Sequence, residues 1–397
     1  QYSRMKVFII LMICVVSMAR SESTNVEEFT VGNNAFAGDV YKKLVPINDG
    51  KNFLFCPLSA EIILALTQIG ARGVTAQQLS KGLHLPEDSK NVEKIFQDLI
   101  PSVKGNDKYN LDSANKIYVK NGYKIKNEYK NVAQNSFGAE IQNINFEERE
   151  SAALEINAWV AGKTHNKITN LIDPKSLNRD SRLMLINTLY FKGTWSHSFI
   201  ERNTHKKPFF YKENDHVDVD MMDTTKYLQY LESSELNAKF LQMRYAGNDV
   251  SMVIVLPNDI EGLSALENQI DKVLSTKLKH TTRVHVQIPK FKSETTIKLT
   301  EILKNLGVKD AFEDYADFSG IGEPGQIPIK ISEVIQKNII EVDEKGTVAA
   351  SATAVHAVTT FSLIREPPPK EFNANHPFIY YIKSSAGVMF VGRYVNK

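Results

Sequence analysis

The feature that most constrains the fold of this chain is a run of small side chains near its C-terminal end. Residues 347–357, TVAASATAVHA, follow the charged, glycine-containing approach EVDEKG at 341–346. The run is too weakly apolar to anchor a core, and it lacks both the composition of a solvated linker and the charged face of a surface helix. Small and β-branched residues permit extended backbone to enter a sheet between two strands without a clash. We therefore interpret the run as a segment able to become an additional strand.

The length and composition of the chain predict one large folded unit. The 397 residues are 42% hydrophobic, which is enough to bury a substantial core, and they contain neither internal repeats nor a low-complexity tract. The longest proline cluster, at 367–369, lies too close to the C-terminus to separate two domains. We predict a single domain over residues 20–397.

The first 19 residues have the features of a secretory leader. Met5 and Lys6 precede the apolar run VFIILMICVVSMA at 7–19, which ends in small residues and is too short to span a bilayer comfortably. We expect residues 1–4 to be upstream sequence and cleavage to follow Ala19, so that the protein is secreted and extracellular. Because the leader carries two of the 48 basic residues and none of the 46 acidic ones, the remaining chain is neutral, with no signal for nucleic acid or a membrane.

The two cysteines exclude an intrachain disulfide in the secreted chain. Cys14 leaves with the leader, and Cys56 remains alone within the apolar stretch NFLFCPLS. An apolar neighbourhood favours a buried, unreactive thiol over a nucleophile. No Asn-x-Ser/Thr sequon occurs, so no N-glycan is expected.

Hydrophobic periodicity predicts an α+β fold. Apolar residues at helical spacing over 36–45 follow Asn33 and Asn34, which are candidate N-caps, and AALEINAWVAGKTHNKI at 152–168 is the clearest helix. The nearly continuous apolar run at 182–191 predicts a central strand, and residues 239–257 predict two strands joined near 246–249. Helices dominate the front and strands the back, which favours large mixed or antiparallel sheets.

The motifs that could indicate an enzyme or a ligand site are weak. Gly320, Gly322 and Gly325 form a G-x-G-x-x-G pattern, but it contains Pro324 and precedes strand-like sequence rather than the helix that a pyrophosphate needs. His280 and His285 share neither a helix face nor a strand face, so a metal site is not expected. No H-E-x-x-H or G-x-S-x-G motif occurs. We therefore expect no enzymatic activity.

Six segments, in order along the chain, resemble the serpin family. NFLFCPLS resembles its shutter region, and INAWVAGKTHNKI the helix that crosses its main sheet. LINTLYFKGTW at 185–195 resembles a central strand of that sheet, EKGTVAASATA the hinge, FNANHPFIYYI at 372–382 the family signature, and VMFVGRYVN the closing strand. These segments, together with the secretory leader, identify the chain as a secreted, arthropod-like member of the family.

The resemblance implies a mobile reactive loop, at about 344–371, that inserts into a large sheet. A target serine protease attacks the loop and is acylated, and the loop then inserts before deacylation, which makes the protein an irreversible suicide-substrate inhibitor. The implied hinge residues are Glu344, Gly346, Thr347, Ala349, Ser351 and Thr353. Alternation places Thr347, Ala349, Ser351 and Thr353 on the buried face, where none is large or charged enough to stop insertion.

The resemblance also implies structural residues beneath the sheet. These are Cys56, Ser59, Asn187, Trp195 and Gln336. Cys56 stands where the family commonly has serine, and Gln336 where many members have histidine, so the polar network that controls sheet opening is expected to differ.

Two peptide bonds are candidates for the reactive bond that the protease attacks. Counting from the hinge glycine gives Thr360–Phe361, whereas Arg365–Glu366 would suit a trypsin-like protease. A cut at Arg365 leaves five more residues in the tether, roughly 16 Å of slack at about 3.3 Å per residue, which would let the trapped protease recover. We favour Thr360.

The partners follow from these expectations. We expect a monomer that forms a covalent complex with a serine protease, possesses no metal and requires no cofactor. Some serpins bind heparin, and a heparin-like glycosaminoglycan has two candidate basic clusters here, although solvated charged faces explain both equally well. They comprise Lys272, Lys277, Lys279 and Arg283, and Arg202, Lys206 and Lys207. The alternative function is a non-inhibitory carrier or storage protein, which the uncharged hinge disfavours.

Overall fold

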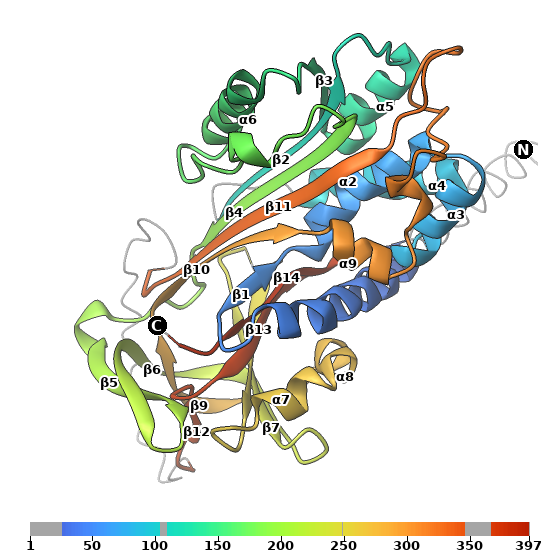
Figure 1. Ribbon diagram of the computed structural model, residues 1–397. Coiled ribbons are helices and arrows are strands. Elements are labelled where there is room, and N and C mark those ends of the chain that lie inside the picture. The colour runs from blue at the N-terminus through green and yellow to red at the C-terminus, as the bar shows by residue number, and fades with distance from the viewer. Residues whose placement is uncertain (1–25, 104–108, 248, 346–366, 397) are drawn as a thin grey trace, which may run out of the picture.

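The computed structural model describes residues 26–103, 109–247, 249–345 and 367–396. Within them, two sheets pack with helices between and around them (Figure 1). The α+β class predicted from periodicity is confirmed. No helix of these described residues is long and apolar enough to cross a membrane.

The smaller sheet has five strands and contains the predicted central strand. Its order is β10 (Phe291–Lys298), β11 (Ile331–Val342), β4 (Leu183–Gly193), β2 (Tyr109–Lys120) and β3 (Glu140–Ile144). β4 and β11 lie side by side and parallel, with Asn187 opposite Gln336, whereas β10–β11 and β2–β4 pair antiparallel. The strand-like sequence QIPIKI that follows the glycine motif forms a strand only from Ile331, where β11 begins, and no helix follows the motif within these residues.

The larger sheet has nine strands, most of them from the last half of the chain. Its order is β1 (Phe53–Phe55), β14 (Gly387–Tyr394), β13 (Phe378–Ser384), β8 (Ser251–Pro257), β7 (Ala238–Arg244), β6 (Asp215–Ser233), β9 (Thr281–Pro289) and β12 (Lys370–Asn373), with β5 (His205–Lys212) paired to β6. The predicted pair of strands joined near 246–249 is β7 and β8. Among the described residues, β12 pairs with β9 alone, and it is the first strand after residue 366.

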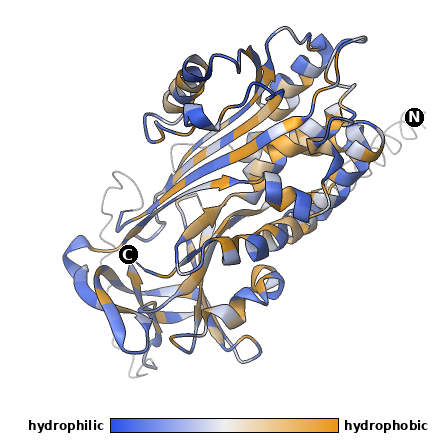
Figure 2. Cartoon of the chain, viewed as in Figure 1, coloured by the Kyte–Doolittle hydropathy of each residue, from blue (hydrophilic) through white to orange (hydrophobic). Residues whose placement is uncertain are grey.

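Helix α2 (Pro57–Gly70) lies between the sheets and is buried along nearly its whole length. The other labelled helices are α3 (Gly73–Gly82), α4 (Ser89–Leu99), α5 (Asn127–Phe137), α6 (Arg149–Lys163), α7 (Leu263–Glu267), α8 (Ile270–Ser275) and α9 (Thr300–Asn305). Short 3-10 segments occupy Ile100–Val103, Pro174–Ser176, Glu201–Asn203 and Asp310–Phe312. Figure 2 shows the contrast between the hydrophobic colours around α2 and the largely hydrophilic β5–β6 hairpin.

Helix α6, predicted from the sequence, covers the outer face of the five-stranded sheet (Figure 1). Ile156 and Val160 of the helix pack with Ile186 of β4 and Ile339 of β11 in a separate hydrophobic cluster. The two strands at the centre of the sheet are therefore covered on one face by α6, while the other face of β4 lies against α2.

The predicted N-caps at Asn33 and Asn34 are wrong. The first described helix spans residues 26–47, so both asparagines lie inside it. Their side chains bind another element: Asn33 Nδ2 donates to the Val388 carbonyl at 3.0 Å, and Asn34 Oδ1 accepts from the Val388 amide at 3.2 Å. An asparagine that caps a helix and an asparagine that binds a neighbouring strand can precede the same apolar pattern in the sequence. Only the position of β14 in the fold shows that Asn33 and Asn34 are of the second kind.

Candidate strand-insertion site

The centre of the five-stranded sheet is a candidate site for the insertion of one more strand. β4 and β11 run parallel, and the chain leaves the end of β11 at Val342 toward the segment 346–366, which lies outside the described residues. A segment that turned back from this end would run antiparallel to β11, and therefore to β4. It would form antiparallel ladders with both neighbours if the two strands moved apart. The predicted loop, about 344–371, overlaps β12 at its far end.

A buried polar network joins β4 and β11 to α2, and we call it the α2 network. Asn187 of β4 donates to Ser59 Oγ at 2.5 Å and to Asn115 Oδ1 of β2 at 2.6 Å. Gln336 of β11 donates to Asn187 Oδ1 at 2.6 Å and to the Cys56 carbonyl at 2.8 Å. Separating β4 from β11 must therefore break the hydrogen bond between Asn187 and Gln336.

Cys56 joins the α2 network through its backbone. Its amide donates to Gln336 Oε1 at 3.1 Å, and its carbonyl accepts from Gln336 Nε2. Burial raises the pKa of the Cys56 thiol far above its ordinary value, which keeps it protonated and unreactive, in agreement with the sequence analysis.

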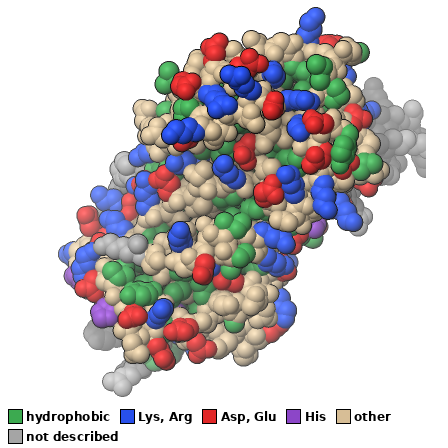
Figure 3. Space-filling view, in the orientation of Figure 1, with side chains coloured by type: hydrophobic (Ala, Val, Ile, Leu, Met, Phe, Trp, Pro, Cys, Tyr) green, Lys and Arg blue, Asp and Glu red, His purple; other side chains and the backbone are tan. Residues whose placement is uncertain are grey.

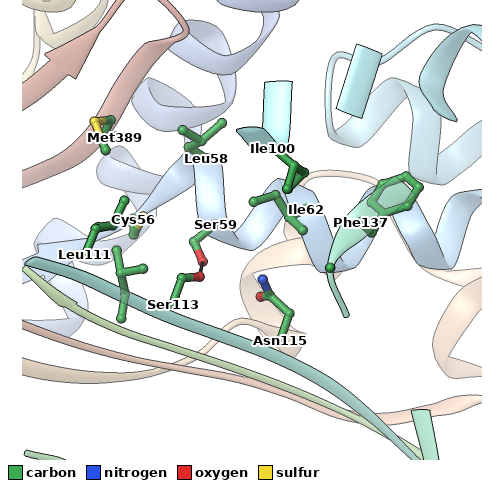
Figure 4. Close-up of a pocket in the computed structure, with 12 residues that line it drawn as sticks. Cys56, Leu58, Ser59, Ile62, Ile100, Leu111, Ser113, Asn115, Phe137 and Met389 are labelled. Atoms are coloured by element: carbon green, nitrogen blue, oxygen red, sulfur yellow. Dashed lines mark hydrogen bonds between the residues drawn. The ribbon is translucent and has the colours of Figure 1, made fainter. Parts of the chain in front are cut away.

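A small cavity of about 180 Å³ lies beside the α2 network (Figure 4). Ser59 of α2 and Ser113 of β2 meet at its edge, with their hydroxyl oxygens 3.4 Å apart, and Leu111 and Phe137 belong to its apolar lining. Incomplete packing here means that β2 loses fewer dispersion contacts when it moves relative to α2 than it would in a close-packed core.

A second group of predicted residues meets where β11 ends. Trp195 stacks on Tyr245 with ring centroids 4.4 Å apart, and its indole donates to the Asp343 carbonyl at 2.9 Å. Glu344, only 5% exposed, accepts from Thr204 at 2.9 Å and from Lys290 at 3.0 Å. These contacts hold the chain as far as Glu344, three residues before the run of small side chains begins in the sequence.

The electrostatics of Glu344 favour its charged form. Burial alone would raise the pKa of this carboxyl, but hydrogen bonds from its own backbone, from Lys290 and from Thr204 outweigh burial and lower it. The sequence offered no sign of Lys290 or Thr204, because neither is near Glu344 along the chain.

The predicted structural residues therefore form two groups rather than one. Cys56, Ser59, Asn187 and Gln336 meet at the middle of β4, whereas Trp195 lies with Glu344 beyond its end. Sequence analysis missed Ser113 and Asn115. These residues lie two apart, and therefore on the same face of β2 as buried Ile117, and this alternation could have been detected in the sequence. It also missed Asn338, which donates to Gln336 Oε1 at 2.7 Å.

The remaining predicted loop residues lie outside the described part of the chain. They are Gly346, Thr347, Ala349, Ser351, Thr353, Thr360, Phe361, Arg365 and Glu366. Their roles remain predictions.

Three of the basic residues predicted to bind polysaccharide pair with acids. Lys272 contacts Glu235 at 2.7 Å, Lys206 contacts Asp220 at 3.0 Å, and Lys207 contacts Asp223 at 3.5 Å. Lys277, Lys279 and Arg202 are exposed, and Arg283 is half-buried. On the face seen in Figure 3, basic and acidic side chains are interspersed.

The fold and this site define a class of α+β protein in which two parallel strands pair at the centre of a five-stranded sheet, and a long segment of chain separates that sheet from the last strands of a nine-stranded sheet. The model of the family Serpin (serine protease inhibitor) matches residues 31–397. The chain belongs to the serpin family.

Relatives and solved structures agree over nearly the whole chain. The crystal structure of Serpin48, a highly specific serpin in the insect Tenebrio molitor, is 39% identical and superposes with a TM-score of 0.85 over 94% of this chain and 98% of that one. Leukocyte elastase inhibitor A of Mus musculus is 36% identical, covering 92% of this chain and 99% of that protein. Antitrypsin of Bombyx mori is 34% identical, and the match covers 92% of this chain and 93% of that protein.

Proposed function

We propose that this protein is an irreversible suicide-substrate inhibitor of a serine protease. The observation that carries the proposal is the direct parallel pairing of β4 and β11, together with the run of small, uncharged residues that follows β11 in the sequence. The matching family model is described as a serine protease inhibitor, and relatives of this chain include proteins named leukocyte elastase inhibitor and antitrypsin, which supports the inhibitor function over the carrier function.

The chemistry uses the target's own nucleophile. The protease serine attacks a loop carbonyl and forms an ester, and the amine of the next residue leaves with the C-terminal part of the chain. The freed N-terminal part of the loop then inserts between β4 and β11 and carries the esterified protease with it. This chain contributes no catalytic residue, only the strand and the gap that receives it.

The residues of the site set the energy of that insertion. The Asn187–Gln336 bond must break, while the new strand gains ladder hydrogen bonds to both neighbours. Thr347, Ala349, Ser351 and Thr353 enter the buried face without an unpaired charge, and Glu344 remains anchored by Lys290.

The setting of this activity follows from the leader. Secretion after cleavage at Ala19 would place the inhibitor in an extracellular proteolytic cascade, for example one of innate immunity. A heparin-like polysaccharide could bind the cluster that includes Lys277, Lys279 and Arg283 and speed the encounter with a protease. A salt-dependent rate increase on adding heparin, lost in Lys277→Ala/Lys279→Ala, is the test of that role.

The experiment that decides between inhibitor and carrier is incubation with trypsin-, chymotrypsin- and elastase-like proteases, followed by a denaturing gel. An inhibitor gives a band that contains both proteins and resists denaturation. A carrier or storage protein gives only cleaved or intact chain with every protease tested.

Two arginine substitutions separate insertion from general damage to the loop. Thr347→Arg places a charge on the buried face at the first inserted position, which slows insertion and converts inhibitor into substrate. Val348→Arg carries the same charge on the outward face and should retain the covalent complex. Equal complex yields from both variants would contradict the insertion mechanism.

The reactive bond is assigned from the peptide released by the complex. If Thr360 is acylated, the peptide begins at Phe361 and Arg365→Ala still forms complex. A peptide that begins at Glu366, with loss of inhibition in Arg365→Ala, would assign the reactive bond to Arg365 instead.

A further inference from the structure

The strand that follows the reactive loop is held weakly by its backbone. β12 has four residues and lies at the edge of the nine-stranded sheet, where, in the part of the chain that the structure describes, it pairs in parallel with β9 alone. Parallel pairs are slightly less stable per residue than antiparallel ones, and an edge strand has only one neighbour. The side chains that tie β12 to the sheet therefore matter for how firmly the far end of the loop is held.

One of these ties is His285 of β9, whose two ring nitrogens contact carboxylates on opposite neighbouring strands. Nδ1 lies 2.8 Å from Glu371 Oε2 of β12, and Nε2 lies 3.2 Å from Asp223 Oδ1 of β6. The imidazole thus bridges β12 to β6 across β9.

Only the protonated ring can make both contacts as hydrogen bonds. A carboxylate accepts and does not donate, and neutral imidazole has one N–H, whereas the cation has two. Burial would lower the pKa of His285, but the hydrogen bonds and charges of Glu371 and Asp223 outweigh it and raise the pKa above its ordinary value.

The other groups on this face of the sheet are consistent with a bridging cation. On β6, Thr225 lies opposite His285, and the next pair along is Tyr227 and Arg283. Lys207 of β5 and Gln287 of β9 both contact Asp223, at 3.5 Å and 2.6 Å. Because Asp223 has these further partners, loss of the proton from His285 weakens chiefly the tie to Glu371, whose side chain is 65% exposed.

We infer that His285 is a positioning residue that, when protonated, holds β12 and with it the far end of the reactive loop. Detachment of β12 would let an uncleaved loop enter the gap between β4 and β11, which would inactivate the inhibitor. This consequence rests on the proposed function. The tie is complete below the ordinary histidine pKa of about 6.5 and is lost as the pH rises through the raised pKa of His285.

The test is hydrogen exchange at the amides of residues 370–374, expressed as protection relative to the unstructured chain at each pH. Protection in the wild-type protein should fall about threefold between about pH 6 and about pH 8.5, the size expected for a partly exposed ionic contact. His285→Gln should be poorly protected at both values, and His285→Lys, which stays charged, should be protected at both.

A matched control is His216→Gln, which removes an exposed histidine from β6 of the same sheet and should behave as wild type. Protection that does not vary with pH in the wild-type protein, or equal loss in the Lys and Gln variants, would overturn the inference.

The consequence is measured separately as the rate at which inhibitory activity is lost on storage. This rate should rise with pH in the wild-type protein and stay low in His285→Lys. Absence of any inhibition would refute the proposed function, while the exchange measurement would still decide the role of His285.

Discussion

At the scale of single residues, Asn187 uses its whole side-chain amide within the core. Both amide hydrogens are donated, to Ser59 and Asn115, and its oxygen accepts from Gln336. Its neighbour Thr188 faces the opposite side of β4, and its hydroxyl has no hydrogen-bond partner among the described residues. Adjacent positions on one strand therefore carry a satisfied and an unsatisfied buried polar group.

Replacing Asn187 by Ala should lower the free energy of unfolding by about 2–4 kcal/mol, because buried partners lose their hydrogen bonds and a cavity is left. Thr188→Val is the matched control in shape and position, and it should be neutral or stabilise the protein by up to about 1 kcal/mol. Urea unfolding followed by tryptophan fluorescence measures both. Equal destabilisation by the two variants would show that packing at β4, rather than the α2 network, determines the loss.

At the scale of elements, the end of β11 is anchored by an ion pair that depends on pH. Lys290 lies in the turn between β9 and β10 and contacts Glu344, which follows the end of β11. The contact therefore links the residues that precede the predicted loop to this turn. The pKa of Lys290 is raised, with the hydrogen bond to Glu344 as the largest cause.

Glu344→Gln should reduce the free energy of unfolding by about 1–2 kcal/mol at neutral pH. The loss is smaller than for a fully buried ion pair, because Lys290 is half-exposed and solvent screens its charge. Since the pKa of Glu344 is lowered, its contribution is present above the ordinary glutamate pKa of about 4.3 and is lost as the pH falls through the lowered value. The difference between variant and wild type should therefore shrink in acid. Lys290→Met should cost less in the Glu344→Gln background than in the wild type; additive costs would contradict the pairing.

At the scale of the whole molecule, the proposed mechanism adds one strand, supplied by residues 346–366, to the five-stranded sheet. Cleavage within residues 346–366 should raise the melting temperature by on the order of 10 °C, if about ten new hydrogen bonds contribute about 1 kcal/mol each in a chain of this size. Differential scanning calorimetry of intact and cleaved protein measures the shift. The Thr347→Arg variant should gain less on cleavage, and an unchanged melting temperature in the wild type would favour the carrier function.

The sequence by itself determined the secondary-structure class, the central strand, the helix α6, the pair β7 and β8, and the buried state of Cys56. Each of these depends on hydrophobic periodicity or on an apolar neighbourhood, which are properties of a short stretch of chain. The resemblance of six segments indicated the family, because six motifs in the same order along the chain are specific to it, whereas a single motif is not.

Only the tertiary structure decided which distant residues meet. Asn33 and Asn34 bind β14 rather than cap a helix, Glu344 pairs with Lys290, and His285 bridges Asp223 and Glu371. Hydrogen bonds between strands far apart in sequence depend on sheet order and register, and a shift of one residue would turn these side chains to the other face. A local pattern contains the period of a strand but not the identity of its neighbour.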